Sequence, residues 1–338
     1  MSEGNFETKT VVLKNRTGMT IELLNLGATW TSCKIPHGDA LREVLLSPGS
    51  IENIQKHTAY MGTSVGRYAN RIKGGQYQFK GESVQLKTNQ AGNTLHGGPL
   101  GFDRRIWDVK EQSANRVVFE LISEDGDQGF PGRVIARTVY ALGEDNSVNI
   151  EYRATTDKPT AIGLTNHAYF NLDGEGSILE HQLTVDARQY LPTNEVGIPL
   201  GELEAVSGTG FDFRQAKALG RDLLCDDQQR SAKGYDHAFF FALERDVREP
   251  VATLASSDGR VTMDVLTNQP AMQVYTGNWL AGNPKREGGE YQDYAGVALE
   301  TQLLPDSPNH PHWPQPSAML LPNEEYLHKT SYLFRSDD

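Results

Sequence analysis

Apolar and polar residues alternate along much of the chain, with the two-residue period of a β-strand that has one buried face. Turns rich in Gly, Asn and Asp separate the alternating segments, as in the stretch Gly143-Glu144-Asp145-Asn146. Because the alternating segments are short and follow one another closely, they predict antiparallel strands. The clearest predicted strands are 11–13, 21–26, 77–79, 84–86, 117–121, 148–152 and 261–265.

Helical periodicity is scarce. The best helix candidate runs from Asp212 to Leu224, with Asp212 as its N-cap and Gly220 shortening it. Strands without long interleaved helices predict an all-β fold, in which two antiparallel sheets pack as a β-sandwich. No repeat or linker divides the chain, so residues 1–338 are expected to form a single domain. The proline-rich segment Pro305–Pro316 is expected to be a surface excursion.

Composition narrows the classes of partner. The chain has 338 residues and a formal net charge of -12, with no basic run to offset it, which disfavours nucleic acid and anionic membranes. The longest apolar run, Ala238–Leu243, is far short of the roughly 20 residues that a membrane-spanning helix needs. No secretory signal is visible at the N-terminus, and Cys33 and Cys225 are expected to be reduced thiols, so a cytoplasmic location is expected.

A histidine in an unusual setting is the first candidate for chemistry. His167 lies in Thr165–Leu172, among aromatic and β-branched residues that predict a strand leading into a turn. Histidine has an unperturbed pKa near ~6.5, so a fixed imidazole is a natural proton carrier at neutral pH. The alternative is a core histidine satisfied by a backbone carbonyl.

Two further stretches combine hydrogen-bond donors with small residues. In Gly66–Ile72, Asn70 and Arg71 are expected to present donors to a ligand oxygen, whereas Arg67 is expected on a solvated edge strand. In Asn93–Gly98, His96 precedes two glycines that allow close backbone approach, by a ligand or by another chain segment.

Two carboxylates stand at the borders of apolar strands. Asp236 precedes a Phe-rich strand, where a carboxylate is costly unless it is paired or bound, for instance to sugar hydroxyls. Glu300 ends the apolar strand that begins at Val297. Desolvation raises the pKa of such a carboxylate and a neighbouring cation lowers it again, which suits a general base. An exposed strand end is the alternative for Glu300.

Metal and cofactor sites are not expected. His310-Pro311-His312 has the spacing of a metal pair, but it is surrounded by prolines and lacks a carboxylate partner in register, so it is expected to be a loop. His37 and His57 are expected on the surface. The sequence has no phosphate-binding glycine loop, nucleophile elbow or dinucleotide fingerprint.

Taken together and in order, these stretches resemble the aldose 1-epimerase (galactose mutarotase) family. The similarity covers nearly the whole chain. The matching motifs are Gly66–Ile72, Asn93–Gly98, Gly101-Phe102-Asp103, Gly129–Gly132, Thr165–Leu172, Gly234–His237, Glu300-Thr301-Gln302, Pro305-Asp306 and Tyr326–Phe334.

The resemblance implies an antiparallel β-sandwich of the supersandwich type, similar to galactose mutarotase, with a sugar cleft across one sheet. It also implies cofactor-free interconversion of the α and β anomers of a free aldohexose. By motif position, His167 would be the general acid and Glu300 the general base. The residues expected to hold or flank the sugar are Asn70, Arg71, His96, Tyr169, Asp236 and Gln273.

This assignment requires His167 to be protonated while Glu300 is ionised. Asp236 is expected to raise the pKa of His167, and Arg71 is expected to keep Glu300 ionised. Two alternatives remain open: a sugar-phosphate epimerase of related fold, and a non-catalytic carbohydrate-binding module. The preferred aldose, and the choice between monomer and homodimer, also remain open.

Overall fold

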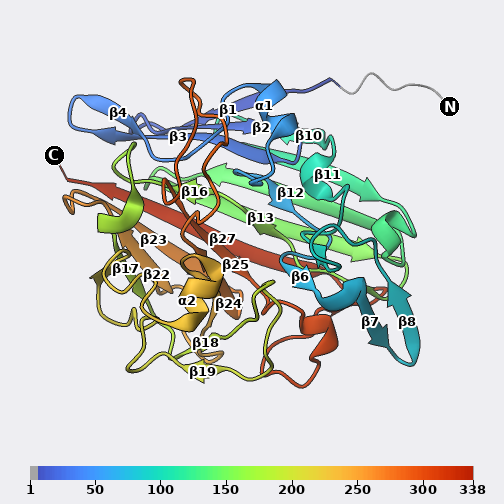
Figure 1. Ribbon diagram of the computed structural model, residues 1–338. Coiled ribbons are helices and arrows are strands. Elements are labelled where there is room, and N and C mark those ends of the chain that lie inside the picture. The colour runs from blue at the N-terminus through green and yellow to red at the C-terminus, as the bar shows by residue number, and fades with distance from the viewer. Residues whose placement is uncertain (1–6, 338) are drawn as a thin grey trace.

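The predicted strands assemble into antiparallel sheets that run across the whole molecule (Figure 1). The computed structural model describes residues 7–337. The largest sheet has nine strands, in the order β10-β11-β12-β13-β27-β23-β22-β17-β20. Its strands are β10 (Asp108–Gln112), β11 (Arg116–Ser123), β12 (Val134–Leu142), β13 (Ser147–Thr156), β17 (Gln182–Val185), β20 (Lys217–Ala218), β22 (Ala252–Ala255), β23 (Val261–Thr267) and β27 (Tyr326–Ser336).

A six-stranded sheet and a four-stranded sheet accompany it. The six-stranded sheet has the order β16-β25-β24-β21-β18-β19. Its strands are β16 (Tyr169–Phe170), β18 (Gln189–Leu191), β19 (Glu204–Ala205), β21 (Asp236–Phe240), β24 (Ala271–Tyr275) and β25 (Val297–Gln302). The four-stranded sheet comprises β1 (Thr10–Lys14), β2 (Thr20–Leu24), β3 (Thr29–His37) and β4 (Ala40–Glu43).

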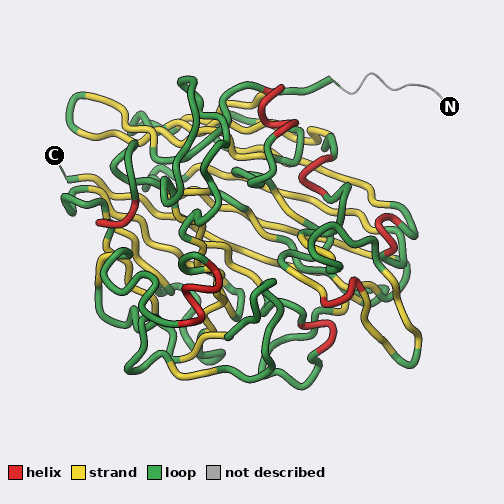
Figure 2. The backbone as a smooth tube through the Cα atoms, in the orientation of Figure 1, coloured by secondary structure: helices red, strands yellow, loops and turns green. Residues whose placement is uncertain are grey.

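Short elements complete the fold, and the helices are brief segments among strands and loops (Figure 2). Four two-stranded ladders pair β5 (Ser64–Val65) with β15 (Thr165–Asn166), β6 (Arg71–Ile72) with β9 (Thr94–Leu95), β7 (Gln76–Phe79) with β8 (Glu82–Gln85), and β14 (Thr160–Ala161) with β26 (Met319–Leu320). The α-helices are α1 (Ile51–Lys56) and α2 (Asp227–Ala232), and the 3₁₀ turns are Lys73–Gly75, Phe102–Arg104, Asp127–Gly129, Ile178–Glu180 and Ser307–Asn309.

The core lies between the sheets. In β25, Val297 and Leu299 join the main cluster of buried apolar side chains, together with Tyr332 of β27. Because side chains alternate along a strand, Ala298 and Glu300 point to the opposite face of the six-stranded sheet. The alternation that builds the core therefore also presents Glu300 on the other side of the sheet. The predicted all-β sandwich is confirmed, and a strand lies at each predicted position, although β2 ends at Leu24 rather than Leu26 and β8 ends at Gln85 rather than Leu86.

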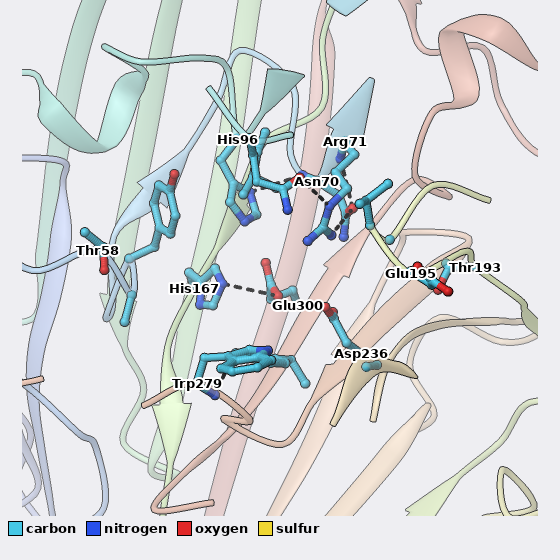
Figure 3. A pocket seen from close by; sticks show the side chains of 18 of the residues that line it. Thr58, Asn70, Arg71, His96, His167, Thr193, Glu195, Asp236, Trp279 and Glu300 are labelled. Atoms are coloured by element: carbon cyan, nitrogen blue, oxygen red, sulfur yellow. Dashed lines mark hydrogen bonds and ion pairs between the residues drawn. The ribbon is translucent and has the colours of Figure 1, made fainter. Parts of the chain in front are cut away.

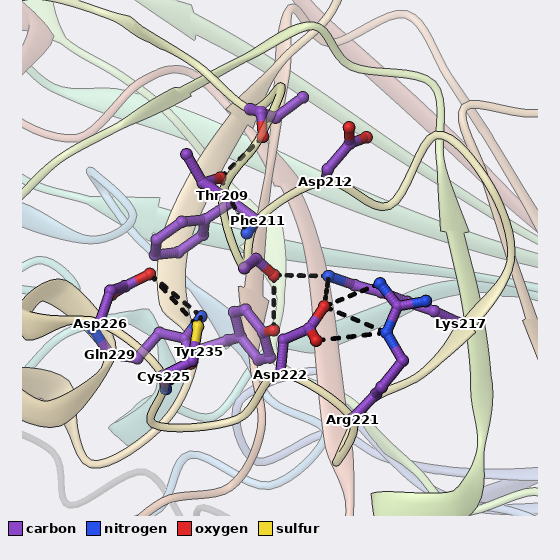
Figure 4. Close-up of polar contacts among 12 residues, drawn as sticks. Thr209, Phe211, Asp212, Lys217, Arg221, Asp222, Cys225, Asp226, Gln229 and Tyr235 are labelled. Carbon is purple, nitrogen blue, oxygen red and sulfur yellow. Dashed lines mark hydrogen bonds and ion pairs between the residues drawn. The ribbon is translucent and has the colours of Figure 1, made fainter.

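The predicted helix over Asp212–Leu224 is wrong. Phe211 and Phe213 are buried on either side of half-exposed Asp212, which is a strand-like alternation, and β20 follows. The buried Lys217 ammonium donates to the Gly210 carbonyl at 2.6 Å and pairs with Asp222 at 2.8 Å (Figure 4). Tertiary pairing has overridden the local helical signal here. The helix begins later, where the Asp226 side chain caps α2 by accepting from the Gln229 N–H.

Arg67 is not on a solvated edge, which corrects another expectation. It is 2% exposed, and its guanidinium donates to the Ser123 hydroxyl and to the carbonyls of Ser123, Glu124 and Pro131. The acceptors are more than 50 positions away in the chain, so local sequence gave no sign of them. His57, also expected on the surface, is 6% exposed.

The proline-rich excursion is only partly on the surface. Residues 305–308 are buried, and Asp306 accepts the Lys73 N–H at 2.9 Å, whereas His312 is exposed. His310 lies 3.3 Å from Asp306, so it has the carboxylate partner that the sequence did not reveal. His310 also stacks on Trp313 at a ring distance of 4.0 Å.

Two smaller findings bear on function. Cys33 and Cys225 are free thiols, as expected. Between residues 7 and 337, none of the helices combines the length and the apolar character needed to cross a lipid bilayer.

Candidate active site

His167 is held by backbone pairing on both sides. It lies between β15, which pairs with β5, and β16, which pairs with β25. Its N–H donates to the Thr63 carbonyl at 2.9 Å, and its carbonyl accepts the Gly62 N–H at 2.9 Å. The two short strands and these bonds fix the backbone that carries the imidazole.

Glu300 reaches the same place from near the other end of the chain. Its strand β25 is paired on both edges, with β16 and β24, so its backbone is rigid. The carboxylate is 2% exposed, and its Oε1 lies 3.6 Å from Nε2 of His167 (Figure 3). Within the described part of the chain, Oε2 of Glu300 and Nδ1 of His167 have no hydrogen-bond partner.

Arg71 and His96 come from the β6–β9 ladder, in which Arg71 pairs with Leu95. His96 N–H donates to the Asn70 carbonyl at 3.0 Å, and Asn70 N–H donates to Nδ1 of His96 at 3.1 Å. Since Nδ1 accepts this bond, the proton of the neutral ring lies on Nε2. His96 therefore offers an N–H donor from Nε2.

The glycines after His96 serve the fold rather than a ligand. A Cβ on Gly97, which has φ +87°, would lie 1.8 Å from the Gly66 carbonyl oxygen. Only glycine permits that approach between the 93–98 segment and the 66–72 segment. Of the two occupants that the sequence left open, the structure identifies another chain segment.

Asp236 begins β21, and Gln273 lies beside it in β24. The Gln273 amide donates to Oδ1 of Asp236 at 2.7 Å, which fixes the carboxylate and leaves Oδ2 available. Asp236 lines the cavity, but Gln273 does not. Gln273 is thus a support for Asp236, while its own Oε1 has no hydrogen-bond partner among the described residues, and its contact with a sugar stays a prediction.

These side chains line one cavity of about 400 Å³. Seven of the eight residues singled out from the sequence lie in its wall: Asn70, Arg71, His96, His167, Tyr169, Asp236 and Glu300. Figure 3 shows His167 and Glu300 in the middle, with Arg71, Asn70 and His96 on one side of them and Trp279 on the other.

Aromatic rings enclose the imidazoles. Tyr169 lies 4.9 Å from the ring of His167, Tyr60 stacks on His167 at 5.9 Å, and Tyr275 lies 5.9 Å from Tyr169. Such rings give a sugar apolar walls and lower the dielectric around its polar groups.

Sequence reasoning missed other wall residues. They include Tyr60, Gln90, Thr193–Gly197, Tyr275 and Trp279. For Tyr275 a signal existed, since it lies two residues after Gln273 and so on the same strand face. Trp279 is 66% exposed at the cavity, and no local pattern marked it.

Burial sets the charge of the central pair. It lowers the pKa of His167 to about 4, with a smaller opposing effect of Asp236. Burial also raises the pKa of Glu300 well above its usual value, Asp236 raises it further, and Arg71 opposes the rise. In the free site, burial therefore opposes both the imidazolium expected at His167 and the carboxylate expected at Glu300. Desolvation outweighs the neighbouring charges on which that expectation relied.

Three of these groups have the spacing of a metal site. Ligand atoms of His96, His167 and Glu300 lie within 4.8 Å of one another, the sole such cluster among residues 7–337. A metal at Nε2 of His96 would require the ring proton to move to Nδ1, which already accepts the Asn70 N–H. The donor set thus favours hydrogen bonding to a neutral ligand over metal coordination.

Comparisons with known proteins identify the family. The family model described as aldose 1-epimerase matches residues 9–333. The aldose 1-epimerase of Escherichia coli (strain K12) is 48% identical over 326 residues, covering 96% of this chain and 94% of the relative. The galactose mutarotase of Bos taurus is 37% identical, covering 94% and 91%.

Solved structures show the same fold. A homologue of aldose epimerase from C. elegans matches with a TM-score of 0.89 and 28% identity, over 98% of this chain and 100% of the other. The galactose 1-epimerase of Lactobacillus acidophilus NCFM matches with a TM-score of 0.85 and 30% identity, over 98% and 99%. This chain belongs to the aldose 1-epimerase family.

Proposed function

We propose that this chain is an isomerase that interconverts the α and β anomers of free aldohexoses such as galactose and glucose. The observation that carries the proposal is the 3.6 Å approach of His167 Nε2 to Glu300 Oε1 inside a cavity lined with sugar-binding groups. An acid and a base held in fixed positions are what the ring opening of a hemiacetal needs. The family membership supports the same reaction.

The reaction consists of two proton transfers and one rotation. Glu300 takes the proton of the C1 hydroxyl while His167 gives a proton to the ring oxygen, and the C1–O5 bond breaks. The open aldehyde turns about C1–C2, and the O5 hydroxyl attacks the other face of C1. His167 then recovers its proton from O5 and Glu300 returns its proton to O1, so no atom or charge is gained or lost.

The pair carries one proton in every working state. In the free site burial keeps this proton on Glu300, and moving it to His167 produces the carboxylate and imidazolium that the first step uses. The two arrangements hold the same number of protons, so they titrate as one unit. Sugar hydroxyls that solvate the charges would favour the ionised arrangement.

The remaining wall residues fit the holding of a neutral sugar. Arg71 and the Nε2–H of His96 supply donors, and charge that develops on a ring oxygen near them would be stabilised. Asp236, held by Gln273, supplies an acceptor for hydroxyls. Arg71 is the one Lys or Arg among the described wall residues, which gives no cluster for a phosphate dianion. A free sugar therefore fits better than a sugar phosphate.

We also propose that the chain forms one domain and that the enzyme is cytoplasmic. The main core cluster contains side chains from Val11 to Phe334, which supports one domain across the chain. Free thiols at Cys33 and Cys225 are compatible with the reducing environment of the cytoplasm, where we place the enzyme.

Polarimetry tests the function directly. The protein should speed the decay of optical rotation of freshly dissolved α-galactose above the buffer rate. Glu300→Gln keeps the shape but removes the base, so kcat should fall by about 10²- to 10⁴-fold with little change in galactose affinity.

The matched control is Glu82→Gln at an exposed position of β8, which should keep wild-type activity. A wild-type protein that binds galactose without speeding mutarotation would instead be a binding module. Near-normal kcat in Glu300→Gln would remove Glu300 from the role of base.

A further inference from the structure

The guanidinium of Arg71 lies against the backbone of Gly197, in a turn that the mechanism has not used. A Cβ built on Gly197 would lie 2.6 Å from Cζ, 2.7 Å from Nη1 and 2.8 Å from Nε of Arg71. Three atoms of the planar group at nearly equal distances mean that its flat face covers Gly197. No side chain larger than hydrogen fits between them.

The turn itself is held firmly. The Asn194 side chain accepts the N–H groups of Val196 and Ile198, and the Asn194 carbonyl accepts the Gly197 N–H at 2.9 Å. One residue earlier, Thr193 N–H donates to the side-chain oxygen of Gln228 in α2 at 2.8 Å. Gly197 is therefore a fixed surface rather than a mobile loop tip.

The same side-chain oxygen of Gln228 also contacts His237, which follows Asp236 in β21. Buried His237 accepts the Asp236 N–H at Nδ1, 3.1 Å away, so its neutral ring carries the proton on Nε2. The Nε2–H faces the Gln228 oxygen at 3.2 Å. The 193–197 turn is thus linked to the backbone of Asp236 through a single amide oxygen.

The hydrogen-bond partners of Arg71 restrain its guanidinium within the plane of the group, but not perpendicular to that plane. Its Nε donates to the Gln90 side chain at 3.2 Å and its Nη1 to the Asn70 side chain at 3.4 Å. Both bonds lie in the plane of the guanidinium. Contact with Gly197 blocks displacement perpendicular to that plane, on the side of the turn.

We propose that Gly197 is a positioning residue for the epimerase reaction. Because glycine has no side chain, the Arg71 guanidinium can pack directly against the backbone at 197, and this contact determines its position in the cavity. This inference rests on the proposed function. Arg71 ends in a flexible side chain and the turn is rigid, so a Cβ at 197 would displace the guanidinium rather than the backbone. A displacement of about 1 Å can cost up to about 100-fold in rate.

Gly208 supplies the matched control. It has φ +79°, against φ +77° for Gly197, and a Cβ there meets no atom within 4 Å. Alanine at either position carries the same left-handed backbone strain. Only alanine at 197 meets Arg71.

The experiment measures kcat/KM for α-galactose by polarimetry in Gly197→Ala and Gly208→Ala. Gly197→Ala should lose about 10- to 100-fold, whereas Gly208→Ala should stay within about twofold of wild type, and both should melt at similar temperatures. Equal kcat/KM in the two variants would overturn the inference. A wild-type protein without mutarotase activity would instead refute the proposed function, so the two failures are distinguishable.

A double substitution tests whether the effect acts through Arg71. In an Arg71→Lys background there is no planar group to displace, so adding Gly197→Ala should change kcat/KM and the galactose Kd by less than about twofold. Calorimetric Kd values keep the comparison possible if activity falls to the buffer rate. Independent, multiplicative losses would overturn the inference, as would a Gly197→Ala crystal structure with Arg71 unmoved and the turn shifted.

Discussion

At the scale of single residues, His167 and Glu300 combine unpaired buried atoms with a place in the cavity wall. Buried polar atoms without partners are uncommon because each costs free energy. Here Oε2 of Glu300 and Nδ1 of His167 are both buried and unpaired, whereas neighbouring Asp236 is held by Gln273. Glu300 keeps acceptor capacity for a bound hydroxyl, which Asp236 has partly used.

The shared proton of this pair predicts a bell-shaped pH dependence of kcat/KM. The pKa of His167 is lowered to about 4, so below pH 4 the pair gains a second proton and loses its base. The pKa of Glu300 is raised, so at higher pH the pair loses its only proton and with it the acid. Polarimetric rates corrected for the buffer reaction should fall on the acid side near pH 4. An acid limb centred near 6.5, or no acid limb, would contradict this assignment.

Elements of structure differ in how much of them the sequence revealed. Segments 148–152 and 261–265 were predictable because one face of each strand is buried and the other is not, so apolar and polar residues alternate in the sequence. The segment 212–224 was not predictable from its local pattern, since its conformation depends on the pairing of Lys217 with Leu183 of β17. The histidine and carboxylate motifs indicated the site, but Gly197 and Trp279 reach it through folding alone.

The hydrogen-bond acceptors of Arg67 lie far away in the chain, so no local sequence pattern indicates them. Because the guanidinium has several such acceptors, replacing Arg67 should lower the stability of the protein considerably. Arg67→Met would remove the donor of the buried Ser123 carbonyl and of the partly buried carbonyls of Glu124 and Pro131. The free energy of unfolding should fall by about 3–5 kcal/mol, measured by urea denaturation. Arg116→Met, at an exposed position in β11, is the control and should change it by less than about 0.5 kcal/mol. A small effect at Arg67 would mean that water replaces the guanidinium.

The whole molecule brings distant parts of the chain to one cavity. Arg71 lies in the first quarter of the sequence, His167 near the middle and Glu300 near the end. The strand that follows His167, β16, pairs directly with β25, which carries Glu300. Because side chains alternate along β25, its two faces have different roles: Val297 and Leu299 pack in the core, and Glu300 faces the cavity. Stability and chemistry are therefore coupled through the same strand.

Burial of histidines across the molecule predicts a loss of stability in acid. The pKa values of six buried histidines are lowered, chiefly by desolvation: His57, His96, His167, His181, His237 and His328. The unfolded chain binds protons at these groups below about pH 6.5, whereas the folded chain does so only at lower pH, near 4 for His57, His167, His237 and His328. Each group therefore costs up to about 1.4 kcal/mol per pH unit as pH falls between its two pKa values.

Two buried carboxyl groups act in the opposite direction, and the net sign follows from the count. The pKa of Asp103 is raised to about 6 and that of Glu300 is also raised, so the folded chain binds their protons first and gains stability as pH falls. Six groups against two give a net loss, and Tm measured by calorimetry should drop steadily between pH 6.5 and 4.5. His328→Asn, outside the cavity, should lower Tm at neutral pH yet make this slope shallower. A Tm that stays level over that interval would show that these imidazoles accept protons inside the fold.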